Sequence, residues 1–288
     1  MSLVTVLLLT YNQEKTLARA FDSILEQKTR FDFEIHVLED CSTDGTAEAC
    51  RAYQNRYPGR IKLFLNEKNV GVSGNLKQGI LRVQSPYYAF LEGDDYWVDP
   101  GKLQLQVDAL ELHPECTLCG HNTLFRNVST GEERPFIPPE DNKDSGVYKL
   151  GDGLSIHPSS RMYRNCVDMT NVPEFMVLDT HIYMIYLTNG DLFYINKTMS
   201  VYNNTGTGYW SGRTKKNKKY TSLKLIRESN EYFQYKHESF HYRHSKLLKT
   251  LKGMLGIRHG WEAFYFLEGF RLRLKYILEK PEIGKSGP

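Results

Sequence analysis

The chain has 288 residues, of which 40% are hydrophobic and 25% are charged, and its formal net charge is +3. This composition excludes an intrinsically disordered chain and supplies a sizeable core for one large domain, or for one domain with an appendage. The sequence contains neither a long apolar run nor a secretory signal pattern, so we expect a cytoplasmic protein without a membrane span.

Strands and helices alternate through the first 122 residues. Residues 4–10 are a continuous β-branched and leucine run, which is typical of a strand buried on both faces of a parallel sheet. Apolar spacing then predicts, in chain order, a helix over 14–27, a strand over 33–38, a helix ending near 57, a strand over 61–65, a helix over 73–83, a strand over 87–91 and a helix over 102–112. This order predicts an α/β fold with a mostly parallel sheet.

The chain becomes polar and rich in Pro, Gly and Asn between residues 123 and 151, which indicates an excursion or a hairpin. Beyond it, we predict a strand within 159–164, a helix over 178–187 and two short strands within 192–202.

The last part of the chain is strongly basic. Residues 213–288 carry 18 Lys or Arg and 7 Asp or Glu, whereas residues 1–212 carry 19 basic and 27 acidic residues. Apolar residues recur at helical spacing between the basic ones, so we predict amphipathic helices that dock on an anionic membrane surface. The alternative is a solvated helical face packed on the rest of the chain. Nucleic acid is not an expected partner, because Phe and Leu share these helices.

Three carboxylates stand within four positions after residues 87–91, namely Glu92, Asp94 and Asp95. Ligands of an open α/β sheet bind beyond the carboxyl ends of its strands. Crowded oxygen ligands favour a divalent cation such as Mg²⁺ or Mn²⁺, bound together with substrate phosphates. We therefore predict a metal–diphosphate site with Asp94 and Asp95 as metal ligands. The alternative is a capped turn before the next helix.

Two further polar tips follow the first and second predicted strands. Thr10, Tyr11 and Asn12 follow the first, and Asp40 follows the second. We predict a nucleotide-diphosphate pocket in which Asp40 accepts a base N–H and Tyr11 offers an aromatic face. Ordinary turn and cap chemistry is the alternative for Thr10 and Asn12.

Asn75 lies at the start of a predicted helix, after the Gly-containing segment 69–74. Its position suits an approach to phosphate or ribose, because helix N-termini attract anions. A solvated helix face is the alternative.

Four segments, at residues 4–12, 34–46, 69–71 and 90–103, resemble family-2 glycosyltransferases of the GT-A fold, a Rossmann-like sheet flanked by helices. The resemblance spans about residues 3–212. It implies transfer of a sugar from a nucleotide-sugar, commonly a UDP-sugar, with inversion at the anomeric carbon and a divalent metal. By the same resemblance, Asp40 would pair with the base, Glu92 would face the ribose, and Asp94 would bind the metal together with Asp95. The predicted nucleotide-sugar-binding residues are Thr10, Tyr11, Asn12, Asp40, Asn75, Glu92, Gly93 and Asp94.

An inverting transfer needs one general base to take the proton of the acceptor hydroxyl. Asp179 resembles the family's base position, because it stands at the start of a predicted helix after a run of apolar residues. Its alternative role is to cap that helix, and Glu174 is the fallback base.

The chain departs from the family pattern near the end of the resemblance. Residues 201–211 look like a late motif that commonly carries Arg after the Tyr and a metal-binding His two residues later. This chain has Asn203 and Thr205 in those places. The departure bears directly on how a metal would be held.

The resemblance implies a catalytic domain over residues 1–212, with a nucleotide-binding half at 1–122 and an acceptor-side half at 123–212. The basic helical region at 213–288 would place the enzyme on the inner membrane face. We expect the acceptor to be a hydroxyl of a glycan or a lipid-linked saccharide, in bacterial surface polysaccharide biosynthesis. The alternatives are a nucleotide-sugar-binding protein with a degenerate site and a sugar nucleotidyltransferase.

Overall fold

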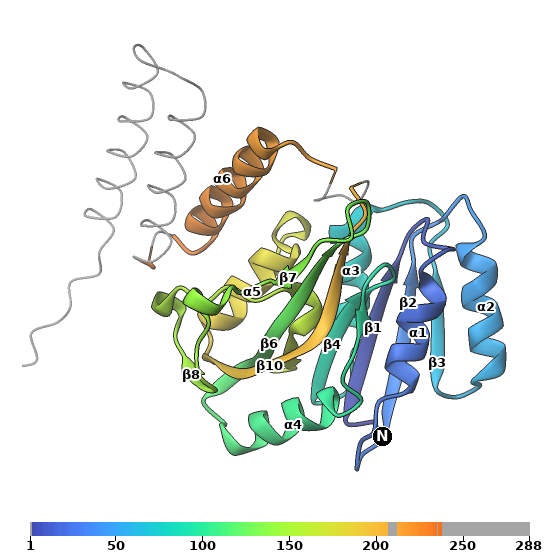
Figure 1. Cartoon of the computed structure of the whole chain (residues 1–288), viewed down its shortest axis with the longest axis horizontal. Helices are drawn as coiled ribbons and strands as arrows, with labels where there is room; N and C mark the ends of the chain where they lie inside the picture. Colours follow the sequence, from blue (N-terminus) through green and yellow to red (C-terminus); the bar gives the residue numbers. More distant parts are fainter. Residues whose placement is uncertain (1, 207–211, 235, 238–288) are drawn as a thin grey trace, which may run out of the picture. The chain divides into compact units, whose positions relative to one another are not determined.

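The computed structural model describes residues 2–206, 212–234 and 236–237 (Figure 1). The chain separates into two compact units, residues 1–208 and residues 209–288. The predicted amphipathic faces beyond residue 237 lie outside the described residues, as do residues 207–211 of the late motif.

The first part of unit 1 is a set of parallel βα repeats. Its strands pair in the order β3-β2-β1-β4, and every neighbouring pair in this set is parallel. The elements are β1 (Val4–Thr10), α1 (Leu17–Leu25), β2 (Phe33–Glu39), α2 (Thr46–Arg56), β3 (Ile61–Leu65), α3 (Gly71–Leu81) and β4 (Tyr87–Glu92). The predicted α/β class is therefore confirmed.

The second part of unit 1 continues the same sheet with mixed strand directions. β9 is antiparallel to both β4 and β6, whereas β10 is parallel to β6. The elements are β5 (Tyr96–Trp97), α4 (Lys102–Leu112), β6 (Cys116–Asn127), β7 (Glu133–Pro135), β8 (Gly146–Tyr148), β9 (Met162–Arg164), α5 (Asp179–Leu187) and β10 (Asp191–Asn204). Four short 3₁₀ helices lie between them, η1 (Pro139–Asp141), η2 (Leu150–Asp152), η3 (Pro158–Ser160) and η4 (Glu174–Met176).

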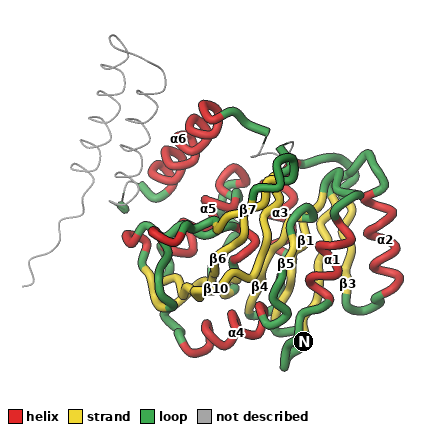
Figure 2. Tube along the Cα trace, in the orientation of Figure 1, coloured by secondary structure: helices red, strands yellow, loops and turns green. Residues whose placement is uncertain are grey.

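Helices cover both faces of the sheet, as Figure 2 shows. All seven residues of β1 are buried, which accounts for its continuous apolar run. Val6 and Leu8 of β1 belong to one apolar cluster with Phe21 of α1, and Ala89 of β4 belongs to the same cluster with Leu103 of α4. Because successive strand residues point to opposite faces, Tyr88, Phe90 and Glu92 of β4 face away from that cluster.

Two local expectations were wrong, and a third was confirmed in one of its two alternatives. The first helix begins at Leu17 instead of residue 14, because the preceding residues form a loop tied to α2. β6 runs on to Asn127 and pairs antiparallel with β7, which confirms the hairpin that was one alternative for residues 123–151. Residues 192–202 belong to one strand, β10, whose register against β6 shifts at three places.

Unit 2 contains α6 (Lys215–Tyr232), which begins with Thr214 accepting a hydrogen bond from the backbone N–H of Asn217. The helix carries six basic and two acidic residues. Among the helices that the structure describes, none has the length and apolar character needed to cross a membrane.

Candidate functional site

Two acidic turns are fastened to the end of β1. The backbone N–H of Asp40 donates to the Thr10 carbonyl at 3.1 Å, and that of Gly93 donates to the Leu9 carbonyl at 2.9 Å. β1 lies between β2 and β4 in the sheet, so its carboxyl end brings both turns to one edge. The edge therefore collects the predicted residues from three strands.

Asn12 joins the loop after β1 to the loop after β2. Its backbone has φ of +52°, its Oδ1 accepts from the Thr43 N–H at 2.8 Å, and its own N–H donates to Ser42 Oγ at 2.9 Å. These bonds give Asn12 a turn-forming role, which was the alternative considered for it. Beside it, Tyr11 is 45% exposed and presents its ring to solvent. Thr10 is buried, and its Oγ1 is without a hydrogen-bond partner.

Asp40 organises the loop that leads into α3. Its Oδ1 accepts from Asn66 Nδ2 at 2.8 Å and from the Val70 N–H at 2.9 Å, and its Oδ2 accepts from the Gly71 N–H at 2.9 Å. Gly71 has φ of +78°, a backbone conformation that glycine adopts without strain. A carboxylate oxygen has two acceptor sites, so Oδ2 keeps one for a further donor.

Asn75 lies in the interface between α3 and the sheet and is 5% exposed. Its Nδ2 donates to the Leu38 carbonyl at 2.9 Å, and its Oδ1 accepts from Asn66 at 3.1 Å. The amide is therefore used within the fold, and its contact with phosphate or ribose stays a prediction.

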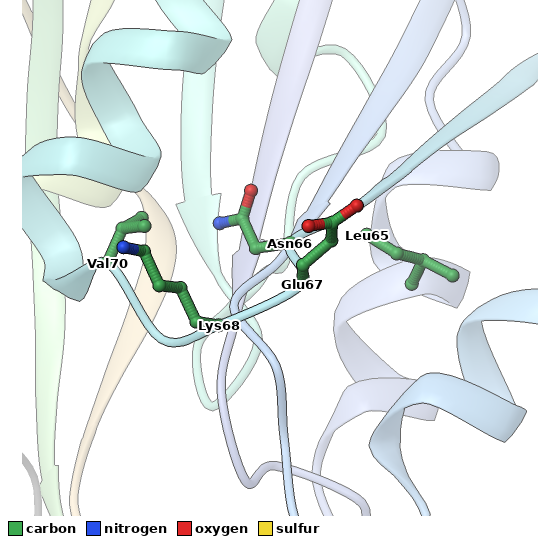
Figure 3. Close-up of a pocket in the computed structure, with 5 residues that line it drawn as sticks. All are labelled: Leu65, Asn66, Glu67, Lys68 and Val70. Carbon is green, nitrogen blue, oxygen red and sulfur yellow. The ribbon is translucent and has the colours of Figure 1, made fainter.

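A shallow pocket of about 490 Å³ adjoins this loop (Figure 3). Leu65, Asn66, Glu67, Lys68 and Val70 line it. Because Asn66 and Val70 also donate to Asp40, the pocket borders the Asp40 carboxylate.

Glu92, Asp94 and Asp95 form a crowded acidic group. Burial, followed by the negative charges of Asp94 and Asp179, raises the pKa of Glu92 to about 8. Burial also raises the pKa of Asp94, and burial with the Asp94 and Glu92 charges raises the pKa of Asp95 well above its ordinary value. The group is therefore unfavourable when fully ionised without a compensating positive charge.

Two carboxamides hold the Asp94–Asp95 turn. Gln13 Nε2 donates to Asp94 Oδ1 at 3.1 Å. From the end of β10, Asn203 donates its N–H to Asp95 Oδ1 at 2.9 Å and its Nδ2 to the Asp94 carbonyl at 2.6 Å. Gly93 permits this packing, since a Cβ there would lie 2.6 Å from Gln13 Oε1.

The acidic group suits a hard cation in its chemistry. Asp95 is 1% exposed, yet its Oδ2 is buried without a hydrogen-bond partner, as is Gln13 Oε1. Such orphaned oxygens are the ligand type that Mg²⁺ and Mn²⁺ prefer. Within the described part of the chain, no group of three or more His, Cys, Asp or Glu side chains is arranged to hold a metal ion by itself.

Asp179 is the first residue of α5, where its charge acts on Glu92 across the edge of the sheet. The helix N-cap is Leu178, and no side chain caps the helix, so the alternative of a capping Asp179 is not what the structure has. Arg161, which is 4% exposed, donates from Nη1 to the Asp179 carbonyl and from Nη2 to the Ile156 carbonyl, both at 2.6 Å.

The fallback base, Glu174, lies in η4 and is exposed. Its Oε1 is 3.2 Å from the position that a Cβ on Gly74 would take, so it lies against the first turn of α3. Lys77 of α3 holds the same loop by donating to the Val172 carbonyl at 2.7 Å.

Sequence reasoning missed the supporting residues of the site, Gln13, Asn66 and Arg161, and the contacts of Asn203. Gln13 lies 81 positions from Asp94, and Asn203 lies 109 positions from it. No local pattern marks contacts at such separations, and polar side chains of these types are common in loops.

Two bacterial proteins are similar to the chain in sequence. It is 30% identical over 261 residues to an uncharacterised protein of Mycobacterium bovis, covering 90% of this chain and 69% of that protein. It is 28% identical over 138 residues to the UDP-Glc:alpha-D-GlcNAc-diphosphoundecaprenol beta-1,3-glucosyltransferase WfgD of Escherichia coli, covering 48% of this chain and 52% of WfgD.

Two solved structures are similar to the chain in fold. TarS 1–349 of Staphylococcus aureus in complex with UDP has a TM-score of 0.61 at 18% identity, covering 95% of this chain and 75% of that one. The mannosyltransferase PcManGT of Pyrobaculum calidifontis, in complex with GDP-Man and Mn²⁺, has a TM-score of 0.55 at 14% identity, covering 95% and 81%. These likenesses confirm the predicted GT-A fold.

The family model of glycosyl transferase family 2 matches residues 5–168, which is more than half of the chain. The matched range contains Asp40 and the whole acidic group at the end of β4. One relative, WfgD, is by its name a glucosyltransferase that uses UDP-Glc and a diphosphoundecaprenol-linked GlcNAc. This chain is therefore a glycosyltransferase and belongs to glycosyl transferase family 2.

Proposed function

We propose that this glycosyltransferase moves a sugar, with inversion, from a UDP-sugar to a hydroxyl of a glycan or lipid-linked acceptor in bacterial surface polysaccharide biosynthesis. The observation that carries the proposal is the meeting of three acidic positions at one sheet edge. Asp40 and the Glu92–Asp95 turn are both bonded to the end of β1, and Asp179 is close enough to Glu92 to raise its pKa.

The nucleotide is assigned to the Asp40 side of the edge. The free acceptor site on Asp40 Oδ2 suits the N–H of a base such as uracil, and the exposed ring of Tyr11 suits stacking. The complexes of TarS with UDP and with UDP-GlcNAc support a uridine nucleotide.

Asp94 and Asp95 would hold a divalent cation, with diphosphate oxygens completing its shell. Bound there, the cation supplies positive charge opposite the leaving diphosphate. The buried, unpartnered Oδ2 of Asp95 supports this assignment, and so does the Mn²⁺ in the PcManGT complex.

Asp179 is the proposed general base. It takes the proton of the acceptor hydroxyl while that oxygen forms a bond to the anomeric carbon. The bond from this carbon to the diphosphate breaks at the same time, and its electron pair leaves with the nucleotide. A single displacement of this kind inverts the anomeric configuration.

The basic region at 213–288 is proposed to dock on an anionic membrane surface, where a lipid-linked acceptor would be within reach. The six basic residues of α6 and the lipid-linked acceptor in the name of WfgD support this assignment. Co-sedimentation with phosphatidylglycerol vesicles should exceed that with phosphatidylcholine vesicles and fall as salt rises. Equal binding to both vesicle types would refute docking by charge.

The test of the function is donor hydrolysis. The chain is incubated in the presence of Mn²⁺ with one donor at a time: UDP-glucose, UDP-N-acetylglucosamine or GDP-mannose. The nucleotide product is measured by chromatography. Slow release of UDP is expected from one of the two UDP-sugars, and NMR should show that the freed sugar has the inverted anomeric configuration. Release of pyrophosphate would indicate a nucleotidyltransferase, and donor binding without turnover would indicate a degenerate site.

A further inference from the structure

Asn203 stands at the end of β10, where it meets the acidic turn that follows β4. Its backbone N–H donates to Asp95 Oδ1 at 2.9 Å, and its side-chain Nδ2 donates to the Asp94 carbonyl at 2.6 Å. One residue therefore contacts both carboxylate-bearing positions, from a strand that reaches them only in the folded chain.

The chemistry of these contacts fixes which end of the amide faces the turn. Two carbonyl oxygens 2.6 Å apart would repel, so the group that faces the Asp94 carbonyl has to be the donor Nδ2. Asn203 thus presents hydrogen-bond donors to this turn, which is the behaviour of a support rather than of a metal ligand.

The two bonds leave one carboxylate oxygen of Asp95 without a hydrogen-bond partner. Asp95 is 1% exposed, its Oδ1 is occupied by the Asn203 N–H, and its Oδ2 has no hydrogen-bond partner. With one oxygen held, the carboxylate cannot rotate freely, so the direction of Oδ2 is set by β10. A ligand oxygen held in this way loses little conformational entropy when it binds a cation.

We propose that Asn203 is a positioning residue for the cation: it aligns the Asp94–Asp95 turn so that Asp95 Oδ2 is presented as a ligand, and it does not ligate the cation itself. The proposal rests on the cation part of the proposed function. It assigns a role to the position where the resembling family commonly has Arg. Groups that support metal ligands change metal affinity by about 10- to 100-fold when they are removed.

The test is direct titration of the chain with Mn²⁺, in which electron paramagnetic resonance measures the free Mn²⁺ at each step, with and without UDP. Asn203→Ala keeps the backbone N–H bond to Asp95 but removes the Nδ2 bond to the Asp94 carbonyl, which helps to hold the turn in place. It should therefore weaken Mn²⁺ binding by about tenfold, the lower end of the range for supporting groups. Asn203→Gln, which keeps a carboxamide donor, should recover most of that loss. The matched control is Asn204→Ala, which removes the neighbouring carboxamide that accepts from the Gly206 N–H and should leave Mn²⁺ affinity unchanged.

A second measurement separates positioning from general damage to the fold. UDP affinity of Asn203→Ala in EDTA should equal that of the wild type, because the nucleotide end of the site is bonded independently through Asp40. Equal Mn²⁺ affinity of Asn203→Ala and wild type would overturn the inference. A loss of UDP affinity in EDTA as large as the loss of Mn²⁺ affinity would also overturn it.

The outcomes also separate this inference from the proposed function. A wild type that releases UDP from a UDP-sugar but binds no Mn²⁺ refutes the role of Asn203 and leaves the transferase intact. A wild type that binds Mn²⁺, loses it in Asn203→Ala and yet turns over no donor supports the role of Asn203 and refutes the proposed function.

Discussion

Arg161 donates to the main-chain carbonyl of Asp179 at 2.6 Å, from a guanidinium that is almost wholly buried. Its second terminal nitrogen donates to the Ile156 carbonyl at the same distance, and the guanidinium carbon lies 4.6 Å from the centroid of the Tyr183 ring. The planar guanidinium of Arg161 thereby links the start of α5 to the segment before β9. The position of the proposed base thus depends on a residue 18 positions earlier.

Arg161→Lys should lower turnover more than it lowers donor affinity. A lysine cannot hold both carbonyls in one plane, so the start of α5 becomes less well placed and one carbonyl loses its donor. We expect donor hydrolysis to slow by about 10- to 100-fold with nearly unchanged KM. Steady-state kinetics check this, and a KM that rises by the same factor as kcat falls would contradict a positioning role.

Asp94→Asn and Asp179→Asn should impair different properties of the enzyme, UDP binding in Mn²⁺ in the first case and turnover in the second. Asp94→Asn removes a proposed cation ligand, so UDP binding should weaken in Mn²⁺ but stay the same in EDTA. Asp179→Asn removes the proposed base, so UDP binding should persist while turnover falls by about 10²- to 10⁴-fold. Calorimetry of UDP binding and donor hydrolysis measure the two effects. Equal loss of UDP affinity in both variants would show that the roles are wrongly assigned.

Asp40→Asn should destabilise the fold even without nucleotide. The carboxylate accepts three donors from the loop after β3, and an amide NH₂ in place of one oxygen would face a donor. We expect a loss of about 1 to 3 kcal/mol in the free energy of unfolding. Urea unfolding measures it, with the exposed Asp32→Asn as a control. If the two variants are equally stable, the Asp40 bonds contribute nothing to the fold.

Lys102 should make stability depend on pH. It is fully buried, its Nζ donates to Gln106 Oε1 at 2.6 Å and lies 4.1 Å from the centroid of the Trp97 ring. Burial lowers the pKa of Lys102 to about 7. The ordinary lysine pKa is about 10.4, so between these values the unfolded chain binds a proton that the folded chain lacks. The destabilisation is therefore fully present below pH 7 and is lost as pH rises toward about 10.4.

Lys102→Met removes this effect. Relative to wild type, its free energy of unfolding should be most favourable below pH 7, and the advantage should shrink by up to about 1.4 kcal/mol per pH unit above that. Denaturant unfolding from pH 6 to 10 measures the difference, with the exposed Lys28→Met as a control. A difference that stays constant across this range would mean that Lys102 is already charged in the fold.

Much of the parallel half of the sheet could be predicted because burial leaves a local mark. β1 is buried at every residue, so its sequence is continuously apolar, and α4 begins and ends at the predicted residues. The shape of β10 could not be predicted, because its breaks in register depend on its pairing with β6.

In the candidate site, too, the acidic residues could be predicted from the sequence but the contacts that support them could not. Its acidic residues follow strands directly, so the order of strands and the residue types of Asp40, Asp94 and Asp95 were sufficient to predict a common edge. Which side chains support them was not predictable, since Asn203 and Gln13 meet the acidic turn only through pairing and loop packing.

By itself, the sequence determined the α/β alternation, the family resemblance and the acidic chemistry at the strand ends, because these depend on residue type and short spacing. Only the tertiary structure decided that Asn12 and Asp40 organise turns, that Arg161 holds Asp179, and that Asn203 holds the Asp94–Asp95 turn. The physical reason is that a hydrogen bond is directional and acts over about 3 Å, so it depends on where folding brings two groups and not on their separation along the chain.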